Sequence, residues 1–200
     1  MVDDCVRPIA KISDFALSKY IQIPHISYTP EDPKDRERSG REARRLWYRA
    51  PEILMRKPLY SQEIDMWAFG CIMAEMTINE PLFNGDSEIE QLFKIFRMIG
   101  SPNQQTFKQI SDHSFKPIFP DWEQIKLSHF TYATQSFEFH NLKKVMTSHR
   151  ENSFKKMKSI AQVLGRDGME LLEQCLNFDP QKRCSAEWAL KHPFFSEFSN

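Results

Sequence analysis

The longest helical pattern in the chain begins at Ser61. Apolar residues recur from there at positions Ile64, Trp67, Ala68, Cys71, Ile72 and Met76. This spacing places them on one face of an α-helix, and the opposite face of the stretch is also largely apolar. A helix that is apolar on most sides is normally buried in a core. We therefore expect this helix to lie at the centre of the molecule.

Three later stretches also have helical spacing. The first consists of Ile89, Leu92, Phe93, Phe96 and Ile99, and it predicts an amphipathic helix that ends at Gly100 to Pro102. The second consists of Phe154, Met157, Ala161 and Leu164, and the third of Met169, Leu172, Cys175 and Leu176. Ser185 is suited to cap a last helix that runs through Leu190.

The remaining segments predict little regular structure. Val6 to Asp14 alternates loosely and predicts a short strand. Glu31 to Arg45 has 11 charged residues in 15, which is typical of a solvated loop. Phe115 to Pro120 predicts a packed loop, and Ser128 to His140 is expected to be irregular. The pattern as a whole predicts a mainly α body with a charged segment near its start.

Composition excludes several classes of protein. The 27 Lys and Arg residues balance 27 Asp and Glu residues, so no net charge attracts nucleic acid or an anionic membrane. The longest uncharged apolar run, Met66 to Ala74, is too short to span a bilayer, and no secretory signal pattern is visible. The four cysteines lie 66, 104 and 9 residues apart, which fits neither a zinc site nor a disulfide framework. These features predict a soluble intracellular protein with reduced thiols.

Four short fragments follow one another along the chain. They are Ser13-Asp-Phe-Ala-Leu-Ser-Lys19, Trp47-Tyr-Arg-Ala-Pro-Glu52, Asp65-Met-Trp-Ala-Phe-Gly70 and Asp179-Pro-Gln-Lys-Arg183. In this order and with these gaps they resemble the second half of a eukaryotic protein kinase. The second fragment resembles the group that holds the cyclin-dependent and mitogen-activated kinases. Leu46 and the stretch Gly85 to Leu92 look most like a cyclin-dependent kinase.

The resemblance implies a partial kinase domain over residues 1–200. It would be a mainly α, C-terminal kinase lobe without the N-terminal β lobe. The activation segment would cover about residues 14–52 and the helical lobe about 53–198, with an insertion at about 128–165.

The resemblance also implies roles for single residues. Asp14 would hold magnesium between the ATP phosphates, because a hard cation binds oxygen ligands; the alternative is an ordinary aspartate at a strand end. Glu52 would pair with Arg183 and fix the end of the activation segment to the helical body. Asp65 would accept backbone N–H groups of a catalytic loop, or it is an acid favoured at a helix N-terminus.

The resemblance implies roles in regulation and substrate binding for four further residues. Thr29 stands at the position of the activation-loop phosphosite of cyclin-dependent kinases, and an unmodified loop threonine is the alternative. A phosphate there would order the loop by pairing with arginines. Arg45, Trp47 and Arg49 would line the substrate pocket, where the family usually has threonine in place of Arg45.

The chain departs from the kinase pattern before and within its first motif. No Gly-rich loop, strand lysine or His-Arg-Asp loop precedes Asp14, and Ala16 replaces the glycine of Asp-Phe-Gly. The full-length parent would transfer the ATP γ-phosphate to Ser or Thr with the help of Mg²⁺. The present chain alone is expected to be inactive and to bind no cofactor. The face that carries Trp67 and Ile72 would lack a partner helix, and we expect it to be partly exposed and to promote self-association.

Other functions fit the same residues. A pseudokinase or docking module would bind a small Cks-type subunit near Gly85 to Leu92, whereas an active parent would also bind a cyclin-type activator and a protein substrate. A relic without function is a third alternative. Between Leu142 and Lys158, six basic residues that include Lys155 and Lys156 are more typical of a solvated helix face than of a nucleic-acid site. We expect no nucleic-acid or membrane partner, and by family analogy a cytoplasmic or nuclear location.

Overall fold

The described part of the chain is mainly helical. The computed structural model describes residues 11–15, 18, 46–111, 120–131 and 150–198, and no strand lies in these ranges. The α-helices are α2 (Pro51–Leu54), α3 (Glu63–Ile78), α4 (Glu88–Ile99), α5 (Gln104–Ile110), α7 (Glu151–Cys175) and α8 (Ala186–Leu190). Short 3₁₀ helices are η3 (Leu127–Thr131), η5 (Pro180–Lys182) and η6 (Pro193–Phe198). The predicted mainly α fold is confirmed.

Three predictions, for one strand and two irregular segments, fall partly outside these ranges. The strand expected over Val6 to Asp14 is wrong for residues 11–14, which are not in a strand, while residues 6–10 lie outside the described part. The packed loop at Phe115 to Pro120 is described only at Pro120, and Ser128 to His140 only as far as Thr131. Within the described ranges, no helix combines the length and the apolar character needed to cross a bilayer.

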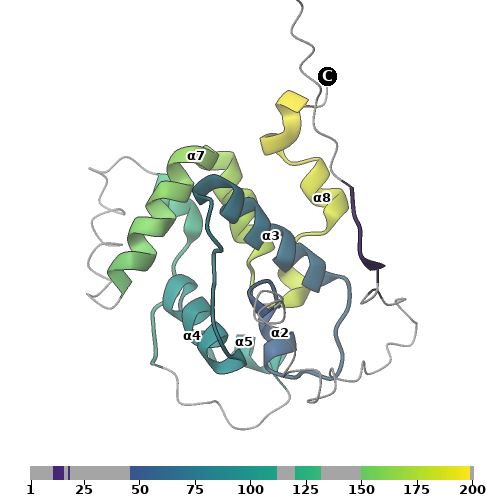
Figure 1. Cartoon of the computed structure of the whole chain (residues 1–200), viewed down its shortest axis with the longest axis vertical. Coiled ribbons are helices and arrows are strands. Elements are labelled where there is room, and N and C mark those ends of the chain that lie inside the picture. The colour runs from purple at the N-terminus through teal and green to yellow at the C-terminus, as the bar shows by residue number, and fades with distance from the viewer. Residues whose placement is uncertain (1–10, 16–17, 19–45, 112–119, 132–149, 199–200) are drawn as a thin grey trace, which may run out of the picture.

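Helix α3 is central, as its apolar pattern predicts. It packs along α7, and α2, α4 and α5 lie together on one side of the pair (Figure 1). Trp67 is fully buried, because Phe83 stacks on its ring at 6.1 Å between centroids and Phe178 lies at 6.3 Å. The expectation of an exposed Trp67 is therefore wrong. Ile72 is 47% exposed and Met76 74% exposed, so the other side of α3 does present apolar surface.

Helix α4 ends at Gly100, as its sequence predicts, and its first turn is capped by side chains. Ser87 accepts a hydrogen bond from the Glu90 N–H, and the Glu90 carboxylate accepts one from the Asp86 N–H. These two bonds satisfy N–H groups that a helix N-terminus would otherwise leave free. Gly100 ends the helix with a φ of 98°. Ile89 is 73% exposed, so its assignment to the buried face was wrong.

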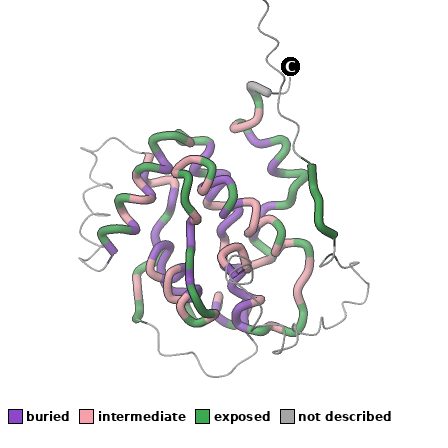
Figure 2. The backbone as a smooth tube through the Cα atoms, in the orientation of Figure 1, coloured by how far each residue is buried: buried purple, intermediate pink, exposed green. Residues whose placement is uncertain are grey.

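Helix α7 joins two stretches that the sequence separates. Gly165 lies between them with φ 63° and ψ −165°, which is not a helical conformation and produces a kink. The two predicted helices therefore exist as the two halves of α7. Both α3 and α7 contain buried residues along their length (Figure 2). Ser185 caps α8 by accepting a hydrogen bond from the Trp188 N–H, as expected.

Arg150, directly before α7, holds the end of α4. Its guanidinium is buried and donates to the backbone carbonyls of Arg97 at 2.6 Å, Met98 at 3.1 Å and Glu123 at 3.2 Å. The C-terminal carbonyls of a helix have no partner within the helix and favour a nearby cation. Burial is the main reason why the pKa of Arg150 falls to about 10, a value at which the group stays charged at neutral pH.

The close approach at Gly100 predicts a strong effect of substitution. A Cβ at position 100 would lie 2.3 Å from the Gln124 Cα, whereas a Cβ at Gly165 would meet nothing within 4 Å. Both glycines have positive φ, so alanine at either carries conformational strain of about 1–3 kcal/mol. We expect Gly100→Ala to lower the free energy of unfolding in urea by more than Gly165→Ala does, because only Gly100 meets backbone. Equal losses would contradict this account of the α4 end.

Candidate functional site

A buried ion pair joins residues that are 131 positions apart. Arg183 Nη1 lies 2.8 Å from Glu52 Oε1, and Nη2 lies 3.1 Å from Oε2. The two side chains are 0% and 1% exposed. Such a two-point contact between guanidinium and carboxylate is among the stronger hydrogen-bonded pairs in proteins. The structure thus brings together the ends of the second and fourth fragments.

Arg183 has no unused N–H group. Besides Glu52, it donates to the Glu63 carbonyl through Nη1 at 2.7 Å, and to the Asn177 carbonyl through Nε and Nη2, both at 3.1 Å. The five N–H donors of an arginine are all engaged by these contacts. A buried charge is tolerated where its hydrogen-bonding capacity is met in this way.

Local structure fixes the backbone position of both Glu52 and Arg183. Pro51 occupies the first turn of α2, where its fixed φ suits a helix start, and Glu52 follows it. Asp179 caps η5 by accepting a hydrogen bond from the Gln181 N–H, and the Arg183 N–H donates to the Asp179 carbonyl. The Arg183 guanidinium carbon lies 5.3 Å from the centre of the Trp67 ring. The third fragment therefore touches the same guanidinium.

A second network fixes Trp47 against the start of α4. Trp47 Nε1 donates to the Gly85 carbonyl at 3.0 Å, and the Gly85 N–H donates to Gln91 Oε1 at 2.7 Å. Gln91 Nε2 closes the ring by donating to the Trp47 carbonyl at 3.0 Å. Gln91 is fully buried, and a Cβ at Gly85 would lie 2.5 Å from its backbone nitrogen. Position 85 therefore requires glycine.

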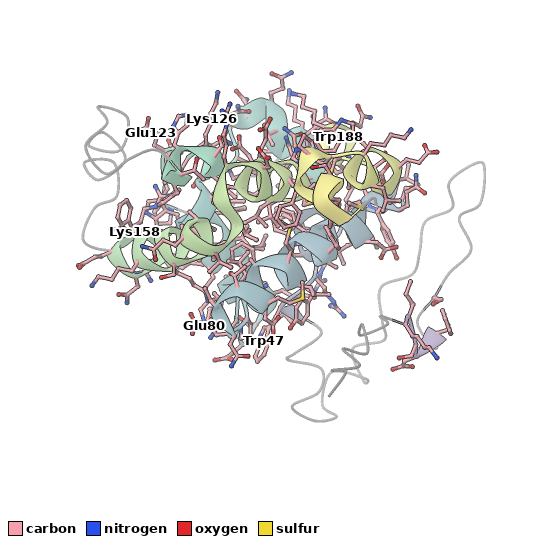
Figure 3. All side chains as sticks on the ribbon, turned by 90° about the horizontal axis from the view of Figure 1, so that it is seen from above. Trp47, Glu80, Glu123, Lys126, Lys158 and Trp188 are labelled. Carbon is pink, nitrogen blue, oxygen red and sulfur yellow. The ribbon has the colours of Figure 1, made fainter. Side chains whose placement is uncertain are left out.

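Residues next to these two networks make weaker contacts at the surface. Tyr48 donates to Glu75 of α3 at 2.6 Å. Arg49 and Arg56 lie 3.8 Å and 3.3 Å from Glu88 of α4. Exposed ion pairs of this kind contribute about 0–1 kcal/mol. Trp47 and Trp188 stand at opposite edges of the molecule in Figure 3, so this region is separate from α8.

The residues expected to take part in catalysis are not assembled in the described part. Asp14 is exposed and has a φ of 61°, and Asp65 is exposed in the first turn of α3. Among the described residues there is no group of three His, Cys, Asp or Glu side chains that could hold a metal ion. Thr29, Arg45 and Ala16 lie outside the described residues.

Two lysines of the basic stretch near α7 pair with carboxylates. Lys155 lies 2.8 Å from Glu151, and Lys156 lies 3.2 Å from Glu80 and donates to the Pro81 carbonyl. Residues 142–149 lie outside the described part. These ion pairs fit the solvated helix face that the sequence favours.

Gln91, Arg150 and the contact between Cys175 and Cys184 were missed by sequence reasoning. Gln91 lies at helical spacing from Ile95 and Met98. A polar residue on this apolar face could have indicated a buried hydrogen-bonding role. Arg150 sits in a basic stretch and offers no such signal, because its partners are distant backbone carbonyls. The two cysteines are nine residues apart, and only the fold shows that their sulfurs meet.

The family model described as protein kinase domain matches residues 1–195. The match covers both ends of the buried ion pair and the Trp47 network.

Breaking the buried pair from one side should be strongly destabilising. Arg183→Met leaves the Glu52 carboxylate buried without its partner, and we expect a loss of about 3–5 kcal/mol in the free energy of unfolding. Adding Glu52→Leu to that variant should lower stability by much less than Glu52→Leu does alone, because the orphaned charge is removed. Urea unfolding of the four proteins measures this coupling.

Arg56→Met is the matched control for this cycle. Arg56 also pairs with a glutamate, but its side chain is 55% exposed. Its replacement should change stability by less than about 1 kcal/mol. The account of the buried pair would be wrong if the two single losses at Glu52 and Arg183 simply added.

Proposed function

This chain belongs to the protein kinase domain family, and from that premise we propose that it is the substrate-side, C-terminal part of a serine/threonine kinase of the cyclin-dependent type. The parent reaction transfers the γ-phosphate of ATP to a Ser or Thr hydroxyl of a protein. We assign this chain the part of the domain that supports the activation segment, and we propose that the chain alone transfers no phosphate.

The single observation that carries the proposal is the set of contacts around Arg183. Its guanidinium binds Glu52 at the end of Trp-Tyr-Arg-Ala-Pro-Glu, lies over Trp67 of Asp-Met-Trp-Ala-Phe-Gly, and belongs itself to Asp-Pro-Gln-Lys-Arg. Three of the four fragments that resemble a kinase therefore meet at one side chain. Chance fragments would have no reason to meet in this way.

The segment that leads to Glu52 is held in a fixed place on the helical body. Trp47 is tied to Gly85 and Gln91, and Tyr48 is tied to Glu75. We propose that Trp47 and Arg49, with Arg45, line the site for the protein substrate, and that phosphorylation of Thr29 regulates it. Rigid support of this kind matters because phosphoryl transfer depends mainly on positioning and charge stabilisation.

The proposed inactivity of the chain alone rests on the kinase motifs that its sequence does not contain before Asp14. Phosphoryl transfer needs a metal-binding set, a group that orients the nucleophile and a cation on the phosphates. Asp14 is the residue proposed to bind magnesium in the parent. ATP, Mg²⁺ and a cyclin-type activator would therefore act on a longer protein in the cytoplasm or nucleus.

The hydrogen bonds at the start of α4 favour a second candidate function. The Trp47, Gly85 and Gln91 ring and the Ser87 cap hold residues 85–92 in place without any catalytic group. Asp86 and Ile89 project from this segment and are exposed. A docking module that binds a small Cks-type subunit there needs nothing upstream of Met1. Loss of binding to such a subunit in Ile89→Arg would support this function.

Sequencing the native transcript upstream of Met1 separates the two functions. The kinase proposal expects an open frame that encodes a Gly-rich loop, a strand lysine and His-Arg-Asp. The protein made from that frame should phosphorylate Ser or Thr in protein substrates, and Asp14→Asn should lower the rate by about 100-fold or more. The exposed Asp121→Asn is the matched control and should keep the full rate. A message that begins at Met1 would contradict the kinase proposal and leave the docking function.

A further inference from the structure

Two buried thiols face each other behind the central ion pair. Cys175 is the last residue of α7, and Cys184 directly follows Arg183. Their Sγ atoms are 3.5 Å apart. The backbone holds this arrangement, because the Cys184 N–H donates to the Gln174 carbonyl at 3.3 Å. The two residues lie in an apolar cluster with Met73, Leu171 and Ala189.

The distance between the sulfurs is close to that needed for a covalent bond. A disulfide has an S–S length of about 2.05 Å, so the sulfurs must approach by about 1.5 Å. Cys184 directly follows the turn from Asn177 to Arg183. Small movements of this turn and of the two side chains would bring the sulfurs together. Metal binding is a poorer explanation of the pair, since the described residues contain no cluster of three ligands at this place or elsewhere.

The two thiols are unequal in their chemistry. The Cys175 and Cys184 thiols share one hydrogen bond, in which either sulfur can be the donor. The hydrogen bond with Cys175 and the nearby Arg183 lower the pKa of Cys184, whereas the hydrogen bond with Cys184 and burial raise the pKa of Cys175. The thiolate is the nucleophilic form of cysteine. Cys184 is therefore the sulfur that reacts first, and its 8% exposure gives a small oxidant a route that fully buried Cys175 lacks.

We propose that Cys175 and Cys184 are a site of reversible oxidation, at which a hydroperoxide such as hydrogen peroxide converts the two thiols into an intramolecular disulfide. The Cys184 thiolate attacks one peroxide oxygen, the O–O bond breaks, and Cys184 becomes a sulfenic acid while hydroxide leaves and is protonated to water. Cys175 then loses its proton and attacks the Cys184 sulfur, and a second water leaves. The two thiols give up two electrons and the peroxide accepts them.

The disulfide between Cys175 and Cys184 would affect the turn that contains Arg183. Cys184 is the direct neighbour of Arg183, and the closed loop would tie the turn from Asn177 to Arg183 to the end of α7. A cross-link lowers the entropy of the unfolded chain. We expect the oxidised protein to melt several degrees higher than the reduced protein. The site thus couples the redox state of the solution to the segment that holds Glu52, and it does not depend on kinase activity.

Peptide mapping tests the proposal directly. Trypsin cleaves after Lys182 and Arg183, so Cys175 and Cys184 fall into the separate peptides 167–182 and 184–191. The native 200-residue chain is treated with hydrogen peroxide, remaining thiols are alkylated, and the non-reduced digest is analysed by mass spectrometry. We expect one species in which the two peptides are joined, two hydrogens lighter than their sum, and its loss on addition of a reductant.

Two variants serve as controls. Cys71 is also buried, and burial raises the pKa of its thiol, so Cys71→Ala should leave the yield of the joined peptides unchanged. Cys184→Ala should abolish the species and leave Cys175 alkylated as a free thiol once the protein is unfolded. The proposal is overturned if the native chain gives separately alkylated peptides at every peroxide concentration. It is equally overturned if Cys175 or Cys184 instead pairs with Cys71 or Cys5.

Discussion

The fold depends on the buried guanidinium of Arg183, which is paired with a carboxylate and fully hydrogen-bonded. Its partners are Glu52 and the carbonyls of Glu63 and Asn177, which come from three separate parts of the chain. Removing one partner would leave a charge in a region of low polarity, at a cost of several kcal/mol. The positions of α2, of the start of α3 and of the turn after α7 are therefore coupled through one side chain.

The apolar core packs directly against the ion pair of Glu52 and Arg183. Trp67 lies beneath the guanidinium and contacts Phe83 and Phe178, so α3 connects the ion pair to the rest of the core. The opposite side of α3 exposes Ile72 and Met76. Helix α3 is apolar on both sides, although only one side is covered. Its sequence therefore lacks the clear polar face that α4 has.

Local patterns predicted the helices well and the long-range contacts poorly. Helical spacing located α3, α4 and both halves of α7, and Ser185 marked the start of α8, because each signal lies within a few residues. The Glu52 and Arg183 pair came only from the kinase resemblance, since no spacing rule links residues so far apart. The exposure of Ile89 and the burial of Trp67 were mispredicted, because which neighbours cover a face is decided by tertiary packing.

Native-state hydrogen exchange tests most directly whether Arg183 couples these segments. The Met55 N–H in the turn after α2 and the Arg183 N–H after η5 both form backbone hydrogen bonds. If one buried pair unites their segments, these amides and those in the centre of α3 should exchange with one common free energy, equal to that of global unfolding. Exchange of the Met55 or Arg183 amide at a much lower free energy than the α3 amides would contradict the account.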